Sequence, residues 1–561
     1  MIYDYVAIKV ASRAVSKPLN YVLSMLSAVG ILLTANAAMS AELEEVVVTA
    51  TRRSADVQDV AIPMTAVTGD ALERTFAQDL RDLTGAAPNV SLDPVGIFQN
   101  SASFFIRGQG SQDIESTADS KVAILIDGVL QARVSSALSD MIDVEAVEIL
   151  RGPQGTLFGR NTVAGAVHIR NNAPKMDTKD ASFSAQVGDF GRFDVKGMVN
   201  FPIIEGELAA RIAAKSTQHD GYWENDFNGK DRSASDRLTV LPSLKWEPND
   251  QLSILVRGEY NKTRDDTYLT SSHHYCRDDP GNFFTNFFLP PDQQLPTDND
   301  LVILTQTLYS WIVENGAAFT PEAFADSTAK ARAICGVPID SVSTSNEYKA
   351  TNTEDRGQGA DLDIWGITTE INYNMPDIGT WTFVGNYREV DEDIIFTIDV
   401  APHDLFAGLR SQEHEQTSLE LRFASEFSDT FDFVTGVYYF EQEYTMLQQS
   451  YGLLFEPNVI LTAPSATPAI TFTSPVTNGQ GGWSNQKNDA WAVFLQGNWH
   501  VTDKLTLTAG GRYTDETKDF THCGVGAGDP TASFGGKTQG CNNVPAYLPD
   551  FTTVLTDVSL T

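Results

Sequence analysis

The chain has 561 residues and a formal net charge of -35, because 74 acidic residues outnumber 39 basic ones. Such a balance excludes a nucleic-acid partner, which needs a basic surface. Beyond the N-terminal segment there is no run of about 18 apolar residues, so a helical membrane protein is also excluded. A membrane β-barrel stays compatible with this composition, because its strands alternate apolar and polar residues.

Residues 1–41 have the pattern of an export signal. Lys9, Arg13 and Lys17 precede an apolar run at 21–33, and small residues follow that run. This order predicts a secretory signal peptide over 1–41. A membrane anchor is the alternative, but the apolar run is too short for one and cleavage-type residues follow it directly.

Residues 42–55 contain a short run of β-branched residues behind two acids, close to the predicted mature N-terminus. An extended segment with an unpaired edge there can be captured by another protein through strand addition. An ordinary first strand is the alternative that this stretch alone leaves open. The candidate recognition residues are Glu44, Glu45, Val46, Val47, Val48, Thr49 and Ala50.

Residues 56–175 read as a small α/β domain. Leu72, Phe76, Leu80 and Leu83 recur at helical spacing and predict a helix over 70–84. The other predicted elements are strands near 61–69, 104–110, 122–129 and 164–171 and a helical turn over 139–147.

The stretch VEILRGPQGTLFGRNT, residues 147–162, closes this domain. Gly152, Pro153, Gly155 and Gly159 predict tight turns and close backbone contacts. The stretch is glycine-rich but lacks the Gly-Lys-Ser/Thr ending of a phosphate-binding loop, which argues against nucleotide binding.

Residues 176–561 change to long alternating strands. In TSLELRF, Leu419, Leu421 and Phe423 share one face, whereas Ser418, Glu420 and Arg422 share the other. Several other segments repeat this alternation, with aromatic residues near the strand ends. The pattern is typical of strands that cross a membrane with one face in lipid.

The connections between these strands alternate between short and long. The predicted short turns lie at 202–206, 247–250, 375–379, 425–430 and 502–504. The long links lie near 217–235, 263–361, 396–411, 447–488 and 521–550, and one external link, near 189–192, is short. Short periplasmic turns and long external loops are typical of outer-membrane barrels. We count about eleven strands, whereas bacterial barrels close with an even number, so we expect only part of a barrel here.

The four cysteines fall in predicted external loops. None belongs to a Cys-x-x-Cys pair, which argues against a zinc site. Pairing Cys276 with Cys335 and Cys523 with Cys541 would close two loops in an oxidising compartment. Free thiols are the alternative.

The longest loop offers a weak candidate for metal contact. His273 and His274 lie near several acids there and could touch a metal complex, or could simply be solvated. A short helix is predicted at 320–335. No catalytic set, resident metal site or cofactor-binding motif is predicted.

With these residues in view, the chain resembles a TonB-dependent outer-membrane receptor. EEVVVTA resembles the TonB box; FFIRGQG, AILIDGV and VEILRGPQGTLFGRNTVAGAVHIRN resemble the plug motifs, which include Gly108, Asp127 and Gly128. The resemblance implies a mainly β fold in which an α/β plug, 56–175, lies inside a transmembrane antiparallel barrel. A plugged barrel of this kind has about 22 strands, so 176–561 would hold about half of it.

The resemblance also implies active uptake of a scarce large substrate, most often a ferric siderophore. Cobalamin, a glycan fragment and an aromatic compound are alternatives. The implied partners are the TonB complex, which would grip residues 44–50, and the outer membrane with its lipopolysaccharide. The receptor would act as a monomer in a Gram-negative bacterium. A passive porin or a barrel enzyme is a further alternative, against which the plug and the TonB box argue.

Receptors of this family fasten the plug through arginines that pair with barrel glutamates. Arg107 and Arg151 each begin an Arg-Gly pair, and Glu420 faces inward, so Glu420 is their expected partner. Gln496 stands where a second glutamate would be expected. The alternative is that each arginine binds only local carbonyl groups. We expect Arg151→Ala to loosen the plug.

Overall fold

Contacts within the computed structural model divide the chain into two compact units, residues 1–47 and 48–561. The second unit holds the predicted plug and barrel strands. The structure describes residues 47–48; 52–266 except 54, 58–59, 61, 76, 96–97, 112–118, 134–137, 139 and 226–230; 349–350; 359–397; 407–451 except 427 and 429; 460–461; 470–471; and 480–526 except 503–504.

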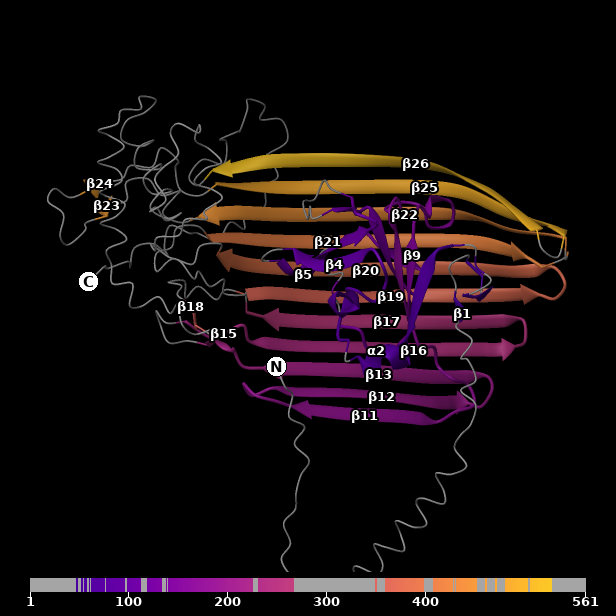
Figure 1. Ribbon diagram of the computed structural model, residues 1–561, viewed down its shortest axis with the longest axis horizontal. Coiled ribbons are helices and arrows are strands. Elements are labelled where there is room, and N and C mark those ends of the chain that lie inside the picture. The colour runs from indigo at the N-terminus through magenta and orange to yellow at the C-terminus, as the bar shows by residue number, and fades with distance from the viewer. Residues whose placement is uncertain are drawn as a thin grey trace, which may run out of the picture. The chain divides into compact units, whose positions relative to one another are not determined.

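An 11-stranded antiparallel sheet, here called the wall, makes up most of this unit (Figure 1). Its neighbours pair in chain order, so each strand lies beside the one that follows it. The strands are β11 (Asp180–Val187), β12 (Phe193–Ile204), β13 (Leu208–His219), β16 (Ser235–Asn249), β17 (Leu252–Asp265), β19 (Gly359–Met375), β20 (Gly379–Thr397), β21 (Ala407–Ser425), β22 (Phe431–Tyr451), β25 (Gln480–Thr502) and β26 (Leu505–Gly526).

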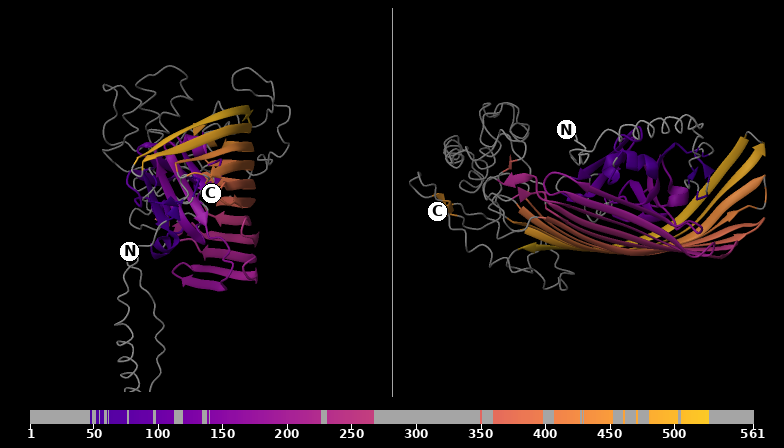
Figure 2. Two further views of the ribbon diagram at one scale, coloured as in Figure 1. Left: turned by 90° about the vertical axis from the view of Figure 1, so that its right-hand side faces the viewer. Right: turned by 90° about the horizontal axis from the view of Figure 1, so that it is seen from below.

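The wall is curved and open, with β11 and β26 at its two edges (Figure 2). Strands are joined at one end by only a few residues, for example 205–207, 250–251 and 376–378, as the sequence predicts. The link between β11 and β12, at 188–192, is also short as predicted. β22, β25 and β26 have 21, 23 and 22 residues, about twice what crossing a hydrocarbon layer requires.

The two faces of the wall differ as the alternation predicts. Leu419 and Leu421 are each 41% exposed on the outer face, whereas Ser418 and Glu420 are buried. The outer row continues across strands, because Leu421 pairs with Val437. Apolar side chains facing outward and polar ones facing inward reverse the order of a water-soluble sheet, which suits a wall with lipid outside.

The plug lies against the concave face of the wall (Figure 2). Its main sheet has the order β3-β9-β10-β7-β8, and a second sheet has the order β4-β5-β6. Within the main sheet only β10 and β7 are parallel. The strands are β3 (Met64–Thr68), β4 (Val90–Val95), β5 (Phe98–Ile106), β6 (Gln109–Ser111), β7 (Val122–Ile126), β8 (Val129–Gln131), β9 (Val144–Arg151) and β10 (Gly165–Asn171).

Short elements complete the described chain. The plug carries helices α2 (Gly69–Arg74) and α3 (Gly155–Phe158) and the 3-10 helix η1 (Leu80–Leu83). None of the helices in the described part of the chain has the length and apolar composition needed to cross a membrane. The remaining strands are β1 (Val47–Val48), β2 (Ala55–Asp56), β14 (Trp223–Asn225), β15 (Asp231–Arg232), β18 (Lys349–Ala350), β23 (Ile460–Leu461) and β24 (Ile470–Thr471).

The single helix predicted over 70–84 is wrong, because two short helices replace it. Thr75 ends α2, and its hydroxyl donates a hydrogen bond to the Ala71 carbonyl at 3.0 Å. Asp79 then begins η1 with a capping box, in which the Asp82 carboxylate accepts the Asp79 amide. These side chains compete for backbone groups and so interrupt the helix.

The helical turn predicted over 139–147 is also wrong. From Val144 onward these residues belong to β9, which pairs with β3 on one side and β10 on the other. Pairing on both sides overrides a local helical preference, because the neighbouring strands supply hydrogen-bond partners for most of the strand's backbone.

The plug has its own apolar core, in which Phe104, Ile124 and Ile149 are at most 3% exposed. A second apolar cluster joins the plug to the wall, where Leu157 and Phe158 lie with Val434 and Phe494. The plug therefore folds around its own core and rests on the wall through this apolar patch and a set of polar contacts.

Candidate functional site

The first contact with the wall comes from the segment just ahead of the plug, where Arg52 forms an ion pair with Glu420 of β21. Arg52 Nη2 lies 3.2 Å from Glu420 Oε2, and both side chains are at most 8% exposed. Arg422 donates to the other carboxylate oxygen at 2.7 Å. The Arg52 guanidinium also stacks 4.5 Å above the Phe158 ring. Burial lowers the pKa of Arg52 below its ordinary value, and the charge of Glu420 opposes that shift.

Arg53 makes a second contact beside the first. Its Nη1 lies 2.7 Å from Asp432 Oδ1, and its Nη2 donates to the Phe433 carbonyl at 2.6 Å. Two consecutive arginines thus attach the segment after residue 50 to the wall. Sequence reasoning missed both, although the Arg-Arg pair one residue after EEVVVTA was a visible signal.

The expected pairing of Glu420 with Arg107 or Arg151 is wrong. Arg151 is the last residue of β9 and lies opposite Gly165 of β10. Gly165 in turn lies opposite Val122, at the start of β7. Glu420 instead reaches Arg52, which binds Gly128, just past the other end of β7. The length of β7 separates the two sites.

Both predicted arginines lie at the plug's own turns. Arg151 Nη1 donates a hydrogen bond to the Pro88 carbonyl at 3.5 Å. The Arg107 side chain is exposed and lies beside Gly152, because a Cβ built on Gly152 would be 3.4 Å from Arg107 Nη1. The local-carbonyl alternative describes Arg151 in this structure.

Two of the predicted plug motifs form hairpin turns with positive φ. Arg107 and Gly108, with φ of 54° and 73°, join β5 to β6. Asp127 and Gly128, with φ of 50° and 82°, join β7 to β8. Consecutive left-handed residues suit two-residue hairpins, and aspartate and glycine tolerate that backbone best. Asp127 also reaches the wall, since Arg257 Nε lies 3.5 Å from its carboxylate.

The glycine-rich stretch makes room for a wall arginine. Gly159 has φ of 77° and ends α3, and a Cβ there would lie 2.9 Å from the Arg512 guanidinium of β26. Gly152 has φ of 113°, which favours glycine, and Gly155 begins α3. Pro153, between them, is exposed. Gly159 therefore serves a plug-to-wall contact, whereas Gly152 shapes the chain.

On the side of the plug that faces β13, the plug carries the acidic residues and the wall carries the basic ones. Asp143 of the plug accepts two hydrogen bonds from Arg211 of β13, at 2.6 and 2.5 Å. Asp140 lies 3.1 Å from Lys215 of the same strand. These four side chains are at most 12% exposed.

Uncharged side chains also form hydrogen bonds between the plug and the wall. Gln416 of β21 accepts the Ala132 amide at 3.1 Å, and its Nε2 donates to the Leu130 carbonyl at 2.8 Å. The side-chain amide thereby pairs with the plug backbone as a strand would. Asn100 of β5 donates to Glu392 of β20 at 3.1 Å. The inward parity of Gln416 with Glu420 could have marked it from sequence.

A third charged cluster links the plug to β26. Arg160 lies 3.2 Å from both Asp119 and Glu516, and Lys518 also pairs with Asp119. Burial alone would raise the pKa of Asp119. The hydrogen bond from Lys518 and the charge of Arg160 outweigh burial, so this pKa lies below its ordinary value.

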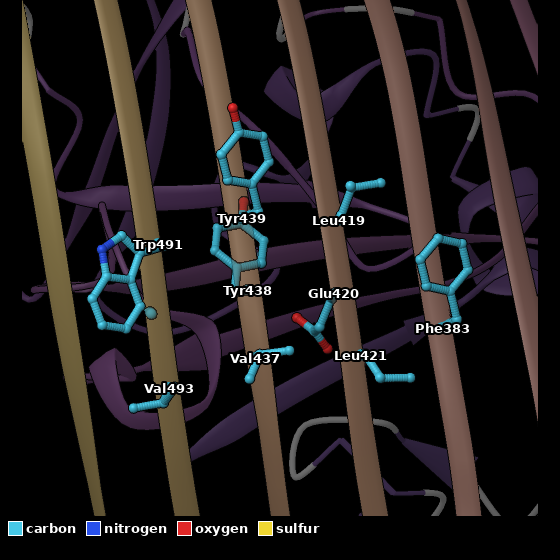
Figure 3. Close-up of a pocket in the computed structure, with 10 residues that line it drawn as sticks. Phe383, Leu419, Glu420, Leu421, Val437, Tyr438, Tyr439, Trp491 and Val493 are labelled. Carbon is cyan, nitrogen blue, oxygen red and sulfur yellow. The ribbon is translucent and has the colours of Figure 1, made fainter.

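The outer face behind Glu420 carries a shallow apolar hollow (Figure 3). Leu419, Leu421, Val437 and Trp491 line it, and Glu420 lies between the two leucines on β21. Glu420 itself bonds Arg52 on the concave side. One strand thus presents lipid-type side chains outward and the plug's charged partner inward.

Several predicted features lie outside the described residues. These are the TonB-box residues other than Val47 and Val48, the histidines of the longest loop, the helix at 320–335 and Cys276, Cys335 and Cys541. Only the backbone of Cys523 is described, in β26. Within the described ranges no group of three or more His, Cys, Asp or Glu side chains could hold a metal ion. The TonB box and the disulfides stay predictions.

Family models match both parts of the chain. The TonB-dependent receptor plug domain matches residues 56–166, and the TonB-dependent receptor-like β-barrel matches residues 296–545. The chain belongs to the TonB-dependent receptors. It is therefore an outer-membrane protein of a Gram-negative bacterium, and the predicted family, fold and location are confirmed.

Curated relatives match part of the chain. It is 27% identical over 169 residues to the metal-pseudopaline receptor CntO of Pseudomonas aeruginosa, which covers 30% of this chain and 22% of that receptor. It is 27% identical over 172 residues to the pesticin receptor of Yersinia enterocolitica, which covers 29% of this chain and 24% of that one.

A solved receptor has the same fold. The ferric yersiniabactin uptake receptor FyuA of Yersinia pestis superposes with a TM-score of 0.58 at 16% identity, over 83% of this chain and 58% of that chain. The chain thus spans just over half the length of that receptor, and less of the curated relatives it matches.

Proposed function

We propose that this chain is the plug and part of the barrel of a receptor that imports a metal chelate of the ferric-siderophore class by TonB-dependent transport. Residues 1–41 would be the signal peptide, 42–55 the TonB-box segment, 56–175 the plug and 176–561 the wall. The observation that carries the proposal is the polar attachment of the plug to the concave face, next to the predicted TonB box.

A plug that must move inside a barrel is better held by polar contacts than by a shared apolar core. Breaking an apolar core exposes surface to water, whereas an ion pair exchanges its partner for solvent or for another charge. Arg52 and Arg53 hold the segment just after residue 50. A pull on residues 44–50 would therefore load these two contacts first.

The substrate class rests on the relatives. Pseudopaline–metal and ferric yersiniabactin are the cargoes named for CntO and FyuA. Both are metal chelates, which supports a chelate here. Cobalamin, a glycan fragment or an aromatic compound would be transported by the same steps, and so remain alternatives that competition experiments can separate.

Deleting residues 44–50 from the receptor in living cells tests the proposal. We expect cells to keep surface binding of a radiolabelled ferric siderophore but to lose its uptake, because the energy-transducing partner has nothing to grip. A matched control deletes seven residues, 452–458, from the predicted long loop near 447–488. Normal uptake by the 44–50 deletion would contradict TonB-dependent transport.

Competition identifies the cargo in the same cells. Catecholate, hydroxamate and mixed-ligand ferric siderophores are offered together with cobalamin, each in excess over the labelled compound. Displacement by one ferric siderophore class would support the chelate proposal. Displacement by cobalamin alone would leave TonB-dependent transport standing but replace the substrate.

A further inference from the structure

The turn at Asp127 and Gly128 has polar contacts in three directions. The Gly128 carbonyl accepts from Arg52 Nη1 at 3.4 Å, on the side of the wall. The Gly128 amide donates to His168 Nε2 at 3.0 Å, on the side of the plug sheet. The Asp127 carboxylate accepts the Asn171 amide at 2.9 Å. One residue, Gly128, therefore joins the arginine that follows the predicted TonB box to β10.

The contact with Gly128 fixes the tautomer of His168. Because Nε2 accepts a hydrogen bond, a neutral His168 carries its proton on Nδ1. That nitrogen lies 3.5 Å from Glu148 Oε2, and Glu148 is fully buried in β9. Arg170 Nη1 lies 3.3 Å from the other Glu148 oxygen. His168 thus has a carboxylate on one side and the turn amide on the other.

The backbone at Gly128 favours glycine. Gly128 has φ of 82°, and a Cβ there would lie 3.3 Å from Arg52 Nη1. The backbone of the turn can therefore approach the guanidinium closely. At the far side of Arg52, Glu420 of the wall completes the chain of contacts at 3.2 Å.

From these contacts we infer that His168 is a positioning residue, which ties the Asp127–Gly128 turn to β10 so that displacement of Arg52 loosens the plug sheet. Loss of Arg52 frees the Gly128 carbonyl, and the turn shifts. The His168 bond carries this shift to β10, whose parallel pairing with β7 connects the two halves of the plug sheet. The inference rests on the proposed function only for the source of the displacement.

Hydrogen exchange in the purified full-length receptor, reconstituted in liposomes, tests this coupling. Peptides covering β8 and β10 are followed separately. We expect Arg52→Ala to accelerate exchange about fivefold in both strands, on the scale of one hydrogen bond. Arg53→Ala is the matched control, because Arg53 contacts Asp432 and Phe433 but not Gly128. It should leave β10 unchanged.

Variants of His168 then separate positioning from general stability. In the His168→Leu background, Arg52→Ala should accelerate β8 but change β10 less than it does in the otherwise unchanged receptor. The contacts of Asp127 with Ile169 and Asn171 still join the turn to β10, but the bond from Gly128 is gone. His168→Gln keeps a side-chain acceptor and should restore the β10 response. A β10 response to Arg52→Ala that stays at full size in His168→Leu would overturn the inference.

The test does not depend on any one variant folding. If His168→Leu loses its plug, an equal β10 response to Arg52→Ala and Arg53→Ala in the otherwise unchanged receptor overturns the inference without it. The experiment needs neither TonB nor substrate, so a receptor that fails the uptake test can still show the coupling. The converse result, normal transport without coupling, is equally distinguishable.

Discussion

The two flanks of the plug meet the wall with opposite charges. Toward β13 the plug is acidic and the wall basic, as in Asp143 with Arg211 and Asp140 with Lys215. Toward β21 and β22 the segment just ahead of the plug is basic and the wall acidic, as in Arg52 with Glu420 and Arg53 with Asp432. A plug turned around inside the wall would face like charges, so the arrangement selects one orientation.

The flanks also differ in their place along the chain. Arg52 and Arg53 directly follow the predicted TonB box, whereas Asp140 and Asp143 lie between β8 and β9. A pull from the N-terminus reaches the basic flank of the plug long before the acidic one. Under the proposed transport, similar ion pairs would therefore have different roles: the first would release early, and the second would hold the remaining plug in register.

Removing Arg211 should have the largest effect on the acidic flank. Arg211→Met leaves Asp143 buried without its bidentate partner, which typically costs about 3–5 kcal/mol. The measurement is the free energy of local opening, taken from hydrogen exchange of β9. Adding Asp143→Asn should recover part of the loss by removing the uncompensated charge. No recovery would mean that packing, not charge, holds this flank.

Reversing the charges of Asp140 and Lys215 tests whether charge sets the orientation of the plug. Asp140→Lys places two ammonium groups together and should lower the same opening free energy by about 2 kcal/mol, on the scale of one charge-assisted hydrogen bond. Lys215→Asp in that background should restore it. If the double variant stays as weak as the single one, the orientation is not set by charge.

Gln416 tests an uncharged contact on β21, the strand that also carries Glu420. Gln416→Glu removes the donor to the Leu130 carbonyl and should cost about 1–2 kcal/mol, because a buried acceptor loses its partner. Faster exchange of the β8 amides is the readout. Gln416→Met is the control, since it adds no charge but leaves both the Ala132 amide and the Leu130 carbonyl without this partner, and it is therefore expected to cost more.

Acidification should weaken the contact with β26. The pKa of Asp119 lies below its ordinary value of 3.8 in the folded receptor. Its stabilisation is therefore complete above that ordinary value and is lost as the pH falls through the lower, folded-state pKa. Cross-linking between the plug and β26, followed from pH 5 downward, should decline in this range. Asp119→Asn should remove the part of the decline that Asp119 causes.

The smallest effect is expected at an exposed pair. Glu73 and Lys196 lie 2.7 Å apart, but the side chain of Glu73 is 68% exposed. Glu73→Ala should therefore change the opening free energy of α2 by no more than about 0.5 kcal/mol. A loss as large as that of Arg211→Met would show that burial does not rank these contacts.

Much of the wall was predictable from sequence, because strand alternation is local. The faces of Leu419 and Glu420 and the short turns follow from period-two patterning and turn residues. The plug hairpins at Gly108 and Gly128 were marked by their glycines. Helix 70–84 failed because Thr75 and Asp79 bind backbone groups in its middle, which a spacing rule does not weigh.

The partners across the plug-to-wall contact were not predictable in the same way. Alternation places Glu420 on the inner face, but which arginine meets it depends on how the plug is rotated and how high it sits. Those two quantities arise from the sum of distant contacts, including Asp143 with Arg211. Motif reasoning therefore favours Arg107 and Arg151, which lie in more conspicuous motifs, over Arg52.

Pulling the full-length receptor from residue 44 by single-molecule force spectroscopy in a membrane tests the order of release most directly. We expect a first rupture at Arg52 and Arg53, so Arg52→Ala with Arg53→Ala should lower its force while Arg211→Met leaves it unchanged and affects only a later event. A first rupture that Arg211→Met weakens as much as the arginine variants do would contradict early release of the basic flank.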